Sequence, residues 1–472
     1  MNKLKLFIEN FLVYGFSGII GKLIPLIMLP IITRLLPDSA AFGINDLFST
    51  MVSFFSAIAI FGMYDAMYRM FFEKDSIEYK KEVCSTAGLF VVFSSFIVFA
   101  LMLLFRAPLS RLFWGSEQYA FLVLIAALAA MMSAVNAIVS APTRMQNKRK
   151  VFVVTNTIAP VLSYSVAILL LLYGNQLTAL PLAALASGSM MVLIFSVLNR
   201  GWFSFQKFSP KLLCQMLVIA VPVIPCFLFY WIFNSCDRLM ITNMIGIGES
   251  GIYAIGAKLG TASQLIYTAF AGGWQYFSFS TMHEDNQVKN NSLVFEYLGI
   301  ISFSASMFVF VLAEPFYRLL FSAEYARGYL VSPYLFLAPL IQMLYQVIGN
   351  QFLVIKKTWP ATLILLCGAL FNVLLNWFLI PHWGIEGAAI ATLSGYTISA
   401  VIASVVLLRM KLMVISGRFL LSAAVMVLFI LAWRFLLLQT VWMSLVLAIG
   451  CCLIFVLLYR KDLSRLIGKL KT

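Results

Sequence analysis

Long apolar stretches constrain this chain more than any other feature of its sequence. A helix crosses about 30 Å of hydrocarbon with roughly 20 consecutive apolar residues, and about fourteen stretches reach that length. Their approximate limits are 10–35, 43–68, 83–105, 118–142, 151–173, 179–199, 215–242, 251–279, 293–313, 329–355, 359–380, 387–408, 419–438 and 440–459. The sequence therefore predicts an all-α integral membrane protein with about 14 transmembrane helices.

The composition agrees with this class. Hydrophobic residues make up 62% of the 472 residues and charged residues only 11%, whereas a soluble domain carries about 25% charged residues. The net charge of +15 would favour nucleic acid binding in a soluble protein. In a membrane protein the position of the cations has to be considered first, because positive charge collects in the cytoplasmic segments.

The distribution of lysine and arginine predicts the orientation. If the N-terminus is cytoplasmic, 24 of the 33 basic residues fall in cytoplasmic segments. Only four fall on the opposite side: Arg106, Arg111, Arg318 and Arg327. We therefore expect a multi-pass protein with both termini in the cytoplasm and no nucleic acid partner. The first span is too long for a cleavable signal peptide, and no small-residue cleavage site follows it.

Several chemical functions lack their motifs. The seven cysteines are scattered without a CxxC pair, and there are only two histidines, so we expect no disulfide, metal or other cofactor. The chain contains no G-x-x-x-x-G-K-[ST] loop for ATP. Predicted external loops are no longer than about fifteen residues, which disfavours a membrane enzyme such as a sugar polymerase or ligase.

An internal repeat predicts two related halves. Gly43-Ile44 matches Gly251-Ile252 and Lys148 matches Lys356, both at an offset of 208 residues, and Ala184–Gly188 matches Ala391–Gly395 at 207. This offset spans six helices, an even number, so both halves have the same orientation and a parallel pseudo-two-fold axis relates them. The predicted domains are a six-helix bundle over 1–199, a cytoplasmic linker over 200–214, a second six-helix bundle over 215–408, and two extra transmembrane helices with a basic tail over 409–472.

Charged residues within the spans mark the candidate site. Asn234, Asp237, Arg238 and Ile241 have the spacing of one helical face, and Lys258 lies in the next predicted span. An ionisable group at this depth costs at least about 2.5–3.5 kcal/mol, so it has to pair, face water or bind a charged ligand. The alternative interpretation is a buried Asp–Arg pair that only orders the helices.

Further charged residues accompany them in the first two spans. Lys22 lies near the middle of the first span, Arg34 at its end, and Asp65 deep in the second. We interpret Lys22, Arg34, Arg238 and Lys258 as a cationic cavity lining. Asp65 and Asp237 are predicted to couple an ion or to pair with these cations, with Asp237 orienting Arg238.

Uncharged polar side chains form stripes on two later spans. Gln342, Gln346 and Asn350 follow one helical face, and Asn372 and Asn376 follow another. With Asn234, they are candidates for a sugar-facing surface. Hydrogen bonds between helices explain the same pattern equally well, and the sequence leaves both interpretations open.

Short motifs in the two halves resemble a known transporter family. Arg34-Leu-Leu-Pro-Asp with Phe42-Gly-Ile-Asn, and Cys236-Asp-Arg-Leu-Met-Ile with Gly248-Glu-Ser-Gly-Ile-Tyr-Ala-Ile-Gly-Ala-Lys258, are similar to the polysaccharide-flippase branch of the multidrug/oligosaccharidyl-lipid/polysaccharide (MOP) exporter superfamily, which includes the Wzx-type O-antigen translocases. The resemblance covers essentially the whole chain. It departs from the usual pattern at Pro37, where glycine is common.

The resemblance implies a flippase that moves an undecaprenyl-diphosphate-linked oligosaccharide across the inner membrane. It also implies contact with membrane lipid, and with a polysaccharide polymerase and chain-length machinery. A net cationic cavity suits a diphosphate and disfavours a drug–cation antiporter of the same superfamily. A peptidoglycan-precursor lipid flippase is the other alternative.

Overall fold

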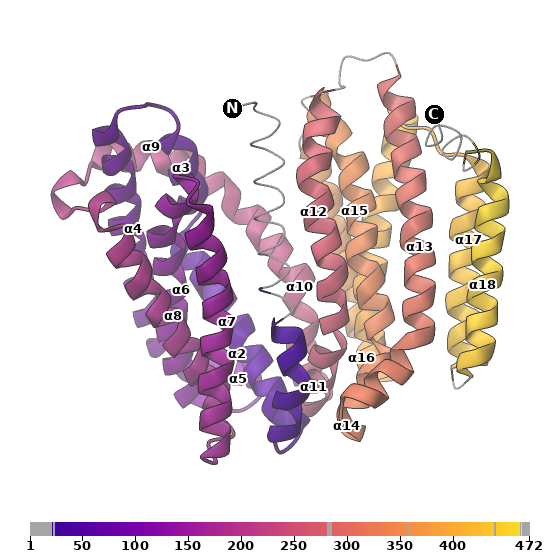
Figure 1. Ribbon diagram of the computed structural model, residues 1–472, viewed down its shortest axis with the longest axis horizontal. Helices are drawn as coiled ribbons and strands as arrows, with labels where there is room; N and C mark the ends of the chain where they lie inside the picture. Colours follow the sequence, from indigo (N-terminus) through magenta and orange to yellow (C-terminus); the bar gives the residue numbers. More distant parts are fainter. Residues whose placement is uncertain are drawn as a thin grey trace. The chain divides into compact units, whose positions relative to one another are not determined.

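The described part of the computed structural model is helical and contains no strand. It comprises residues 21, 24–280, 286–355, 359–438, 440–462 and 464. A short helix covers Ile24–Leu35. The further α-helices (Figure 1) are α2 (Ser39–Ile60), α3 (Met63–Phe71), α4 (Ile77–Leu104), α5 (Arg106–Trp114), α6 (Ala120–Met145), α7 (Arg149–Leu172), α8 (Ala179–Leu198), α9 (Pro210–Ala220), α10 (Ile224–Met244), α11 (Ile247–Gly256), α12 (Lys258–Ser280), α13 (Gln287–Leu320), α14 (Ala323–Ala326), α15 (Ser332–Val354), α16 (Trp359–Arg409), α17 (Gly417–Ala432) and α18 (Val441–Leu458).

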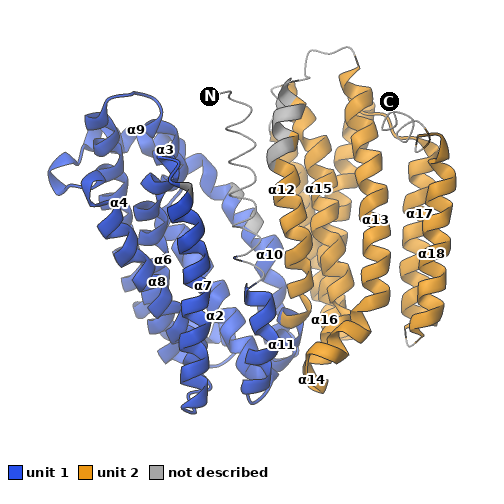
Figure 2. Cartoon of the chain, viewed as in Figure 1, with its two compact units in different colours: residues 1–254 blue, residues 255–472 orange. Residues whose placement is uncertain are grey.

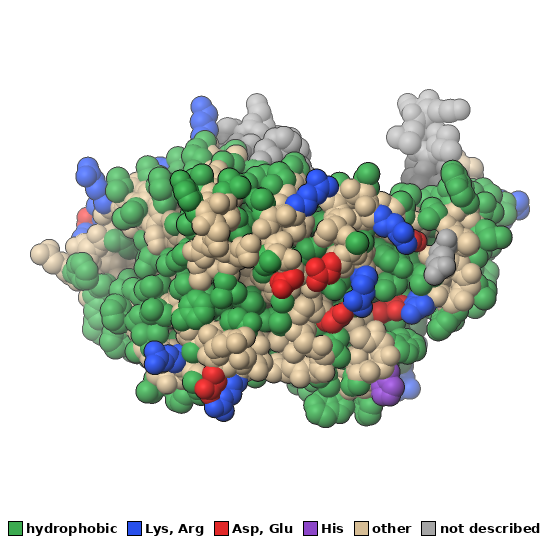
Figure 3. Space-filling view, turned by 90° about the horizontal axis from the view of Figure 1, so that it is seen from below, with side chains coloured by type: hydrophobic (Ala, Val, Ile, Leu, Met, Phe, Trp, Pro, Cys, Tyr) green, Lys and Arg blue, Asp and Glu red, His purple; other side chains and the backbone are tan. Residues whose placement is uncertain are grey.

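These helices confirm the predicted class. Within the described ranges, ten helices are long and apolar enough to span a membrane, and one bent helix pair raises the number to eleven. The surface carries many exposed apolar side chains (Figure 3), among them Phe93, Leu193 and Val446. Such a surface is soluble only in lipid. The chain is therefore a multi-pass membrane protein, while the predicted number of fourteen spans stays a prediction.

The residues form two compact units, 1–254 and 255–472 (Figure 2). In unit 1, α6 packs against α2, α4 and α8. Ala126, Ala130 and Ala134 lie buried along α6, and such small side chains let neighbouring helices approach closely. The limits predicted for the two bundles, the linker and the C-terminal pair stay predictions.

Basic segments from different parts of the sequence meet at one end of unit 1. Lys207, between α8 and α9, forms an ion pair with Glu78 at the start of α4. Arg144, in the last turn of α6, donates to the Tyr64 hydroxyl of α3 at 3.4 Å. Three segments that were predicted to be cytoplasmic therefore lie together, and we refer to this region as the basic end of unit 1.

Helix α5 covers the opposite end of unit 1. Its Trp114 Nε1 donates to the carbonyl oxygen of Ile44 in α2 at 3.1 Å. Asn243 of α10 donates from Nδ2 to the carbonyl oxygen of Leu112 at 2.9 Å. These bonds fix the start of α2 and the end of α10 beside each other, which positions the candidate site described below.

In unit 2, α16 joins two of the predicted spans. Gly384 interrupts its helical backbone with φ 58° and ψ −138°, a region that glycine adopts far more readily than other residues. The two halves pack on each other, since Asn372 donates to the Thr392 hydroxyl at 3.2 Å and Ser399 to the Ile364 carbonyl oxygen at 3.5 Å. The predicted spans 359–380 and 387–408 thus form a tight helical hairpin.

Ion pairs hold α17 and α18 to the rest of unit 2 at both ends. Arg418 lies in the first turn of α17, with Nε 3.4 Å from Glu296 Oε2 of α13 and Nη1 2.5 Å from Asp462 Oδ2. Beyond the other end of α17, Arg434 Nε lies 2.5 Å from Glu386 Oε1 of α16. Both glutamates are buried, so the C-terminal pair is specifically docked.

Candidate functional site

Two glycines related by the repeat contact each other in unit 1. A Cβ atom on Gly43 of α2 would lie 2.3 Å from the carbonyl oxygen of Ile247, and one on Gly251 of α11 would lie 1.9 Å from that of Ser39. Residues 43 and 251 differ by 208, and so do 39 and 247. The contact is therefore reciprocal between residues that the offset of 208 relates.

A charged cluster lies next to this glycine contact. Asp46 is one turn along α2 from Gly43, and its Oδ2 lies 2.8 Å from Nε of Arg238 in α10. The side chains of Arg238 and Asp46 are 22% and 9% exposed. Nη1 of Arg238 also donates to the carbonyl oxygen of Asn234 at 3.0 Å. The guanidinium is thus held on two sides by oxygen atoms.

Two contacts hold the carboxylate of Asp237, and its predicted role of orienting Arg238 stays a prediction. Its Oδ1 accepts from the backbone N–H of Arg238 at 2.8 Å, and its Oδ2 accepts from the buried Tyr253 hydroxyl. The carboxylate of Asp237 is therefore fixed by its own helix and by α11. Asp46 forms an ion pair with the Arg238 guanidinium.

Asp46 was not among the residues predicted from the sequence. The signal was present, because Asp46 lies within the predicted span 43–68 and directly follows the Phe42–Asn45 motif. A carboxylate there carries the same cost that marked Asp237. With Asp46 included, the candidate cations outnumber the candidate carboxylates four to three rather than four to two.

Arg34, Asp65 and Lys258 lie on three helices other than α10. Arg34 is exposed at the end of the helix Ile24–Leu35, and Asp65 is exposed in the first turn of α3. Lys258 begins α12 in unit 2 and is half-buried. Lys22 lies outside the described residues. The described structure thus joins Asp237, Arg238 and Asn234 in one place, and the other assignments stay predictions.

The uncharged polar stripes lie inside unit 2. Gln342 and Asn350 of α15 are buried and Gln346 is half-buried. Asn372 and Asn376 of α16 are fully buried, and Asn376 donates to the Asn372 side-chain oxygen at 3.4 Å. With the bond from Asn372 to Thr392, these contacts account for both α16 asparagines as links within the helical hairpin. Their predicted role in facing a sugar stays a prediction.

Removing either glycine of the reciprocal contact tests this geometry. Gly43→Ala and Gly251→Ala each place a methyl group within about 2 Å of a backbone carbonyl oxygen, so α2 and α11 must separate, and overpacking of this kind costs about 1–3 kcal/mol. We expect both variants to aggregate at lower temperature than the wild type when the detergent-purified protein is heated.

The matched control is Gly450→Ala in α18, where no atom lies within 4 Å of the added Cβ. Alanine is favoured over glycine within a helix by about 1 kcal/mol, so this variant should be as stable as the wild type or more so. Equal thermal stability of all three variants would contradict the contact.

A family profile described as "polysaccharide biosynthesis protein" matches residues 7–275. This is more than half of the chain and contains Asp46, Asp237, Arg238 and Tyr253. The chain belongs to this family. This match, with the solved structures described next, confirms the predicted resemblance to the polysaccharide-flippase branch of the MOP superfamily. A comparison with curated proteins found no match.

Solved structures agree with the fold expected of the family. "Lipid II flippase MurJ, inward closed conformation" matches with a TM-score of 0.68 and 15% identity, over 96% of this chain and 99% of that chain. An inward-facing multidrug resistance MATE family transporter of the MOP superfamily matches with a TM-score of 0.62 and 14% identity, over 84% and 98%. A MOP superfamily transporter from Pyrococcus furiosus matches with a TM-score of 0.60 and 14% identity, over 85% and 95%. This chain thus has the fold of these transporters.

Proposed function

We propose that this protein is a flippase for an undecaprenyl-diphosphate-linked oligosaccharide. The substrate is a repeat unit of O-antigen, capsule or exopolysaccharide, and it moves from the cytoplasmic to the outer leaflet of the inner membrane by alternating access. Membership of the polysaccharide biosynthesis family and the MOP transporter fold support this proposal. The family and the fold are typical of transporters rather than of catalytic enzymes.

The observation that carries the proposal is the pair of Arg238 and Asp46 within apolar helices. A guanidinium presents paired N–H donors that match phosphate oxygens. In this structure Asp46 forms an ion pair at its Nε edge without the alignment of a hydrogen bond. An incoming diphosphate competes with Asp46 for that edge, so binding exchanges one anionic partner for another at little cost in desolvation.

The other charged groups have roles that follow from this exchange. Asp237, held by Tyr253 and by the backbone of Arg238, keeps the base of the arginine side chain in place while the guanidinium changes partner. Lys22, Arg34 and Lys258 complete the cationic lining, and Asp65 serves as an ion-coupling group. Among the uncharged candidates, the exposed Asn234 and the half-buried Gln346 face the sugars.

The positive-inside pattern supports an inner-membrane orientation with cytoplasmic termini. The basic end of unit 1 then faces the cytoplasm, where the lipid-linked sugar is assembled. A polysaccharide polymerase and chain-length machinery act on the product after it reaches the outer leaflet, and they are the proposed partners.

A second candidate function is a lipid II flippase, which the fold likeness to MurJ favours. Both substrates carry a prenyl diphosphate, so Arg238 and Asp46 suit either one. A drug–cation antiporter is disfavoured because the described carboxylates of the cluster are already bound to Arg238 and Tyr253.

Two bacterial hosts separate these functions. One lacks its own repeat-unit flippase, and the other is depleted of its peptidoglycan-precursor flippase. We expect the protein to restore surface glycan in the first and to leave the second unable to grow. The measurements are surface glycan by immunoblot and colony formation. Rescue of the second host alone would replace the proposed substrate with lipid II, and rescue of neither, with the protein present in the membrane, would contradict both.

A further inference from the structure

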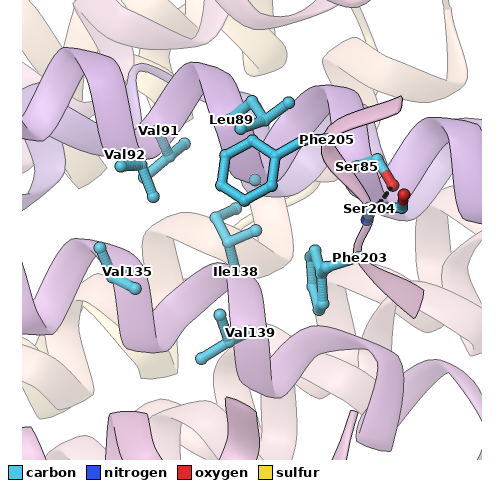
Figure 4. Close-up of a pocket in the computed structure, with 11 residues that line it drawn as sticks. Ser85, Leu89, Val91, Val92, Val135, Ile138, Val139, Phe203, Ser204 and Phe205 are labelled. Carbon is cyan, nitrogen blue, oxygen red and sulfur yellow. Dashed lines mark hydrogen bonds between the residues drawn. The ribbon is translucent and has the colours of Figure 1, made fainter. Parts of the chain in front are cut away.

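A cleft of about 170 Å³ opens at the basic end of unit 1. Its walls are α4, α6 and the segment 203–205 that joins α8 to α9 (Figure 4). Apart from Ser85 and Ser204, the lining side chains are apolar, and valines and aromatic rings dominate. Ser85 to Val92 of α4 fall in the first half of the predicted span 83–105. The cleft is therefore expected at the depth of one leaflet of the bilayer.

Specific hydrogen bonds hold the joining segment over this cleft. The Ser85 hydroxyl accepts from the backbone N–H of Ser204 at 3.0 Å. The Thr86 hydroxyl accepts from the backbone N–H of Ser209 at 3.2 Å. A Cβ on Gly88 would lie 3.0 Å from the ring of Phe203, so glycine provides the room for that ring. The cleft is thus held in shape by specific contacts between the joining segment and α4.

One side of the cleft is open to the exposed apolar face of α4. Val92 lines the cleft and is 42% exposed, and Phe93 beside it is 67% exposed. Phe205 also lines the cleft, and 85% of its surface is exposed. In a membrane protein such surfaces contact acyl chains. A chain that leaves the bulk lipid beside α4 has a direct path into the cleft.

The joining segment is also basic. Residues 200–211 carry Arg200, Lys207 and Lys211 and no acidic residue. Glu78 of α4 pairs with Lys207 of this segment. Arg200 and Lys211 are exposed. Clusters of lysine and arginine next to a transmembrane helix are attracted to anionic headgroups. An apolar cleft therefore lies beside a positive surface at the depth of the headgroups.

We propose that this cleft binds an anionic phospholipid. One acyl chain fills the space between α4 and α6 beneath Phe203 and Phe205, and the phosphate lies on the cations of segment 200–211. The bound lipid anchors this segment to the membrane surface. The site is distinct from the cluster of Asp46 and Arg238, and it does not depend on which substrate the protein transports.

Native mass spectrometry of the purified full chain tests this site. The probes are phosphatidylglycerol and phosphatidylcholine with identical acyl chains. We expect the wild type to retain phosphatidylglycerol at least several-fold more than phosphatidylcholine. Val139→Trp, which fills the cleft, should lose the retained phosphatidylglycerol. Arg200→Gln/Lys207→Gln/Lys211→Gln should retain the two lipids equally.

Matched controls exclude general effects of bulk and charge. Val446→Trp adds the same bulk on the exposed face of α18, and Arg106→Gln removes a cation near the opposite end of unit 1. Both should retain lipid as the wild type does. Equal retention of the two lipids by the wild type, or unchanged retention by Val139→Trp, would overturn the proposal. Displacement of phosphatidylglycerol by undecaprenyl phosphate at equal concentration would also overturn it, because the cleft would then be a prenyl-chain site.

A second measurement covers the case in which Val139→Trp fails to fold. Phosphatidylglycerol with a photoreactive group near the end of one acyl chain is added to the wild-type protein, and the cross-linked peptides are identified. We expect cross-links within 85–92, 135–139 or 203–205. Cross-links confined to other parts of the protein would contradict the site.

Discussion

Replacing Arg238 with alanine is expected to abolish surface glycan export, and replacing it with lysine should reduce export strongly. Alanine removes the donor that the diphosphate is proposed to bind. Lysine keeps the charge but loses the paired N–H geometry. The measurement is surface glycan in the host that lacks its own repeat-unit flippase, normalised to the amount of protein in the membrane.

Alanine at position 238 has a second effect that must be separated from the first. It leaves Asp46 buried without its ion-pair partner, and breaking a buried pair from one side costs about 3–5 kcal/mol. The double variant Asp46→Asn/Arg238→Gln removes both charges together and so avoids this penalty. We expect it to restore the amount of folded protein but not export.

The double variant decides between two roles for the pair. If Arg238 only orders the helices, removal of both charges should restore export along with folding. If Arg238 binds the substrate, export stays absent in a well-folded protein. The single variant Asp46→Asn tests the pair from the other side, because it removes the carboxylate that competes with the substrate for the Arg238 guanidinium. We expect tighter binding of a soluble diphosphate and slower export in this variant, because release of the substrate becomes harder.

Much of the fold follows from patterns within single segments of the sequence. Apolar stretches place the helices, and the offset of 208 residues identifies the repeat without the structure. The contact between Gly43 and Gly251 gives a physical reason for glycine at these two equivalent positions. Neither residue tolerates a side chain at its contact, and no local pattern reveals which glycine faces which.

The site could be predicted only in part, for a related reason. Arg238 and Asp237 were found because they lie in one helical turn of an apolar span. Asp46 lies far away in the sequence, and its pairing with Arg238 depends on how α2 and α10 pack. Asn372 was left with two interpretations, because a hydrogen bond to Thr392 needs the bend at Gly384 to bring the halves of α16 together.

A second large effect is expected from the membrane potential. A diphosphate moving outward carries negative charge toward the positive side, and each net charge gains about 2.3 kcal/mol per 100 mV. One uncompensated charge therefore shifts the transport equilibrium by roughly fifty-fold at 100 mV, since 1.36 kcal/mol corresponds to a factor of ten. Cations that move with the substrate reduce this factor. We propose that transport depends on this potential, on an ion gradient, or on both, and needs no ATP.

Translocation of a fluorescent undecaprenyl-diphosphate-linked oligosaccharide in proteoliposomes tests the central claim most directly. The fraction of label in the outer leaflet is read from quenching by a reagent that does not cross the membrane. We predict movement without ATP, faster under an imposed inside-negative potential, and absent in vesicles that contain Asp46→Asn/Arg238→Gln. A strict requirement for ATP, with no response to potential or to an ion gradient, would contradict the account.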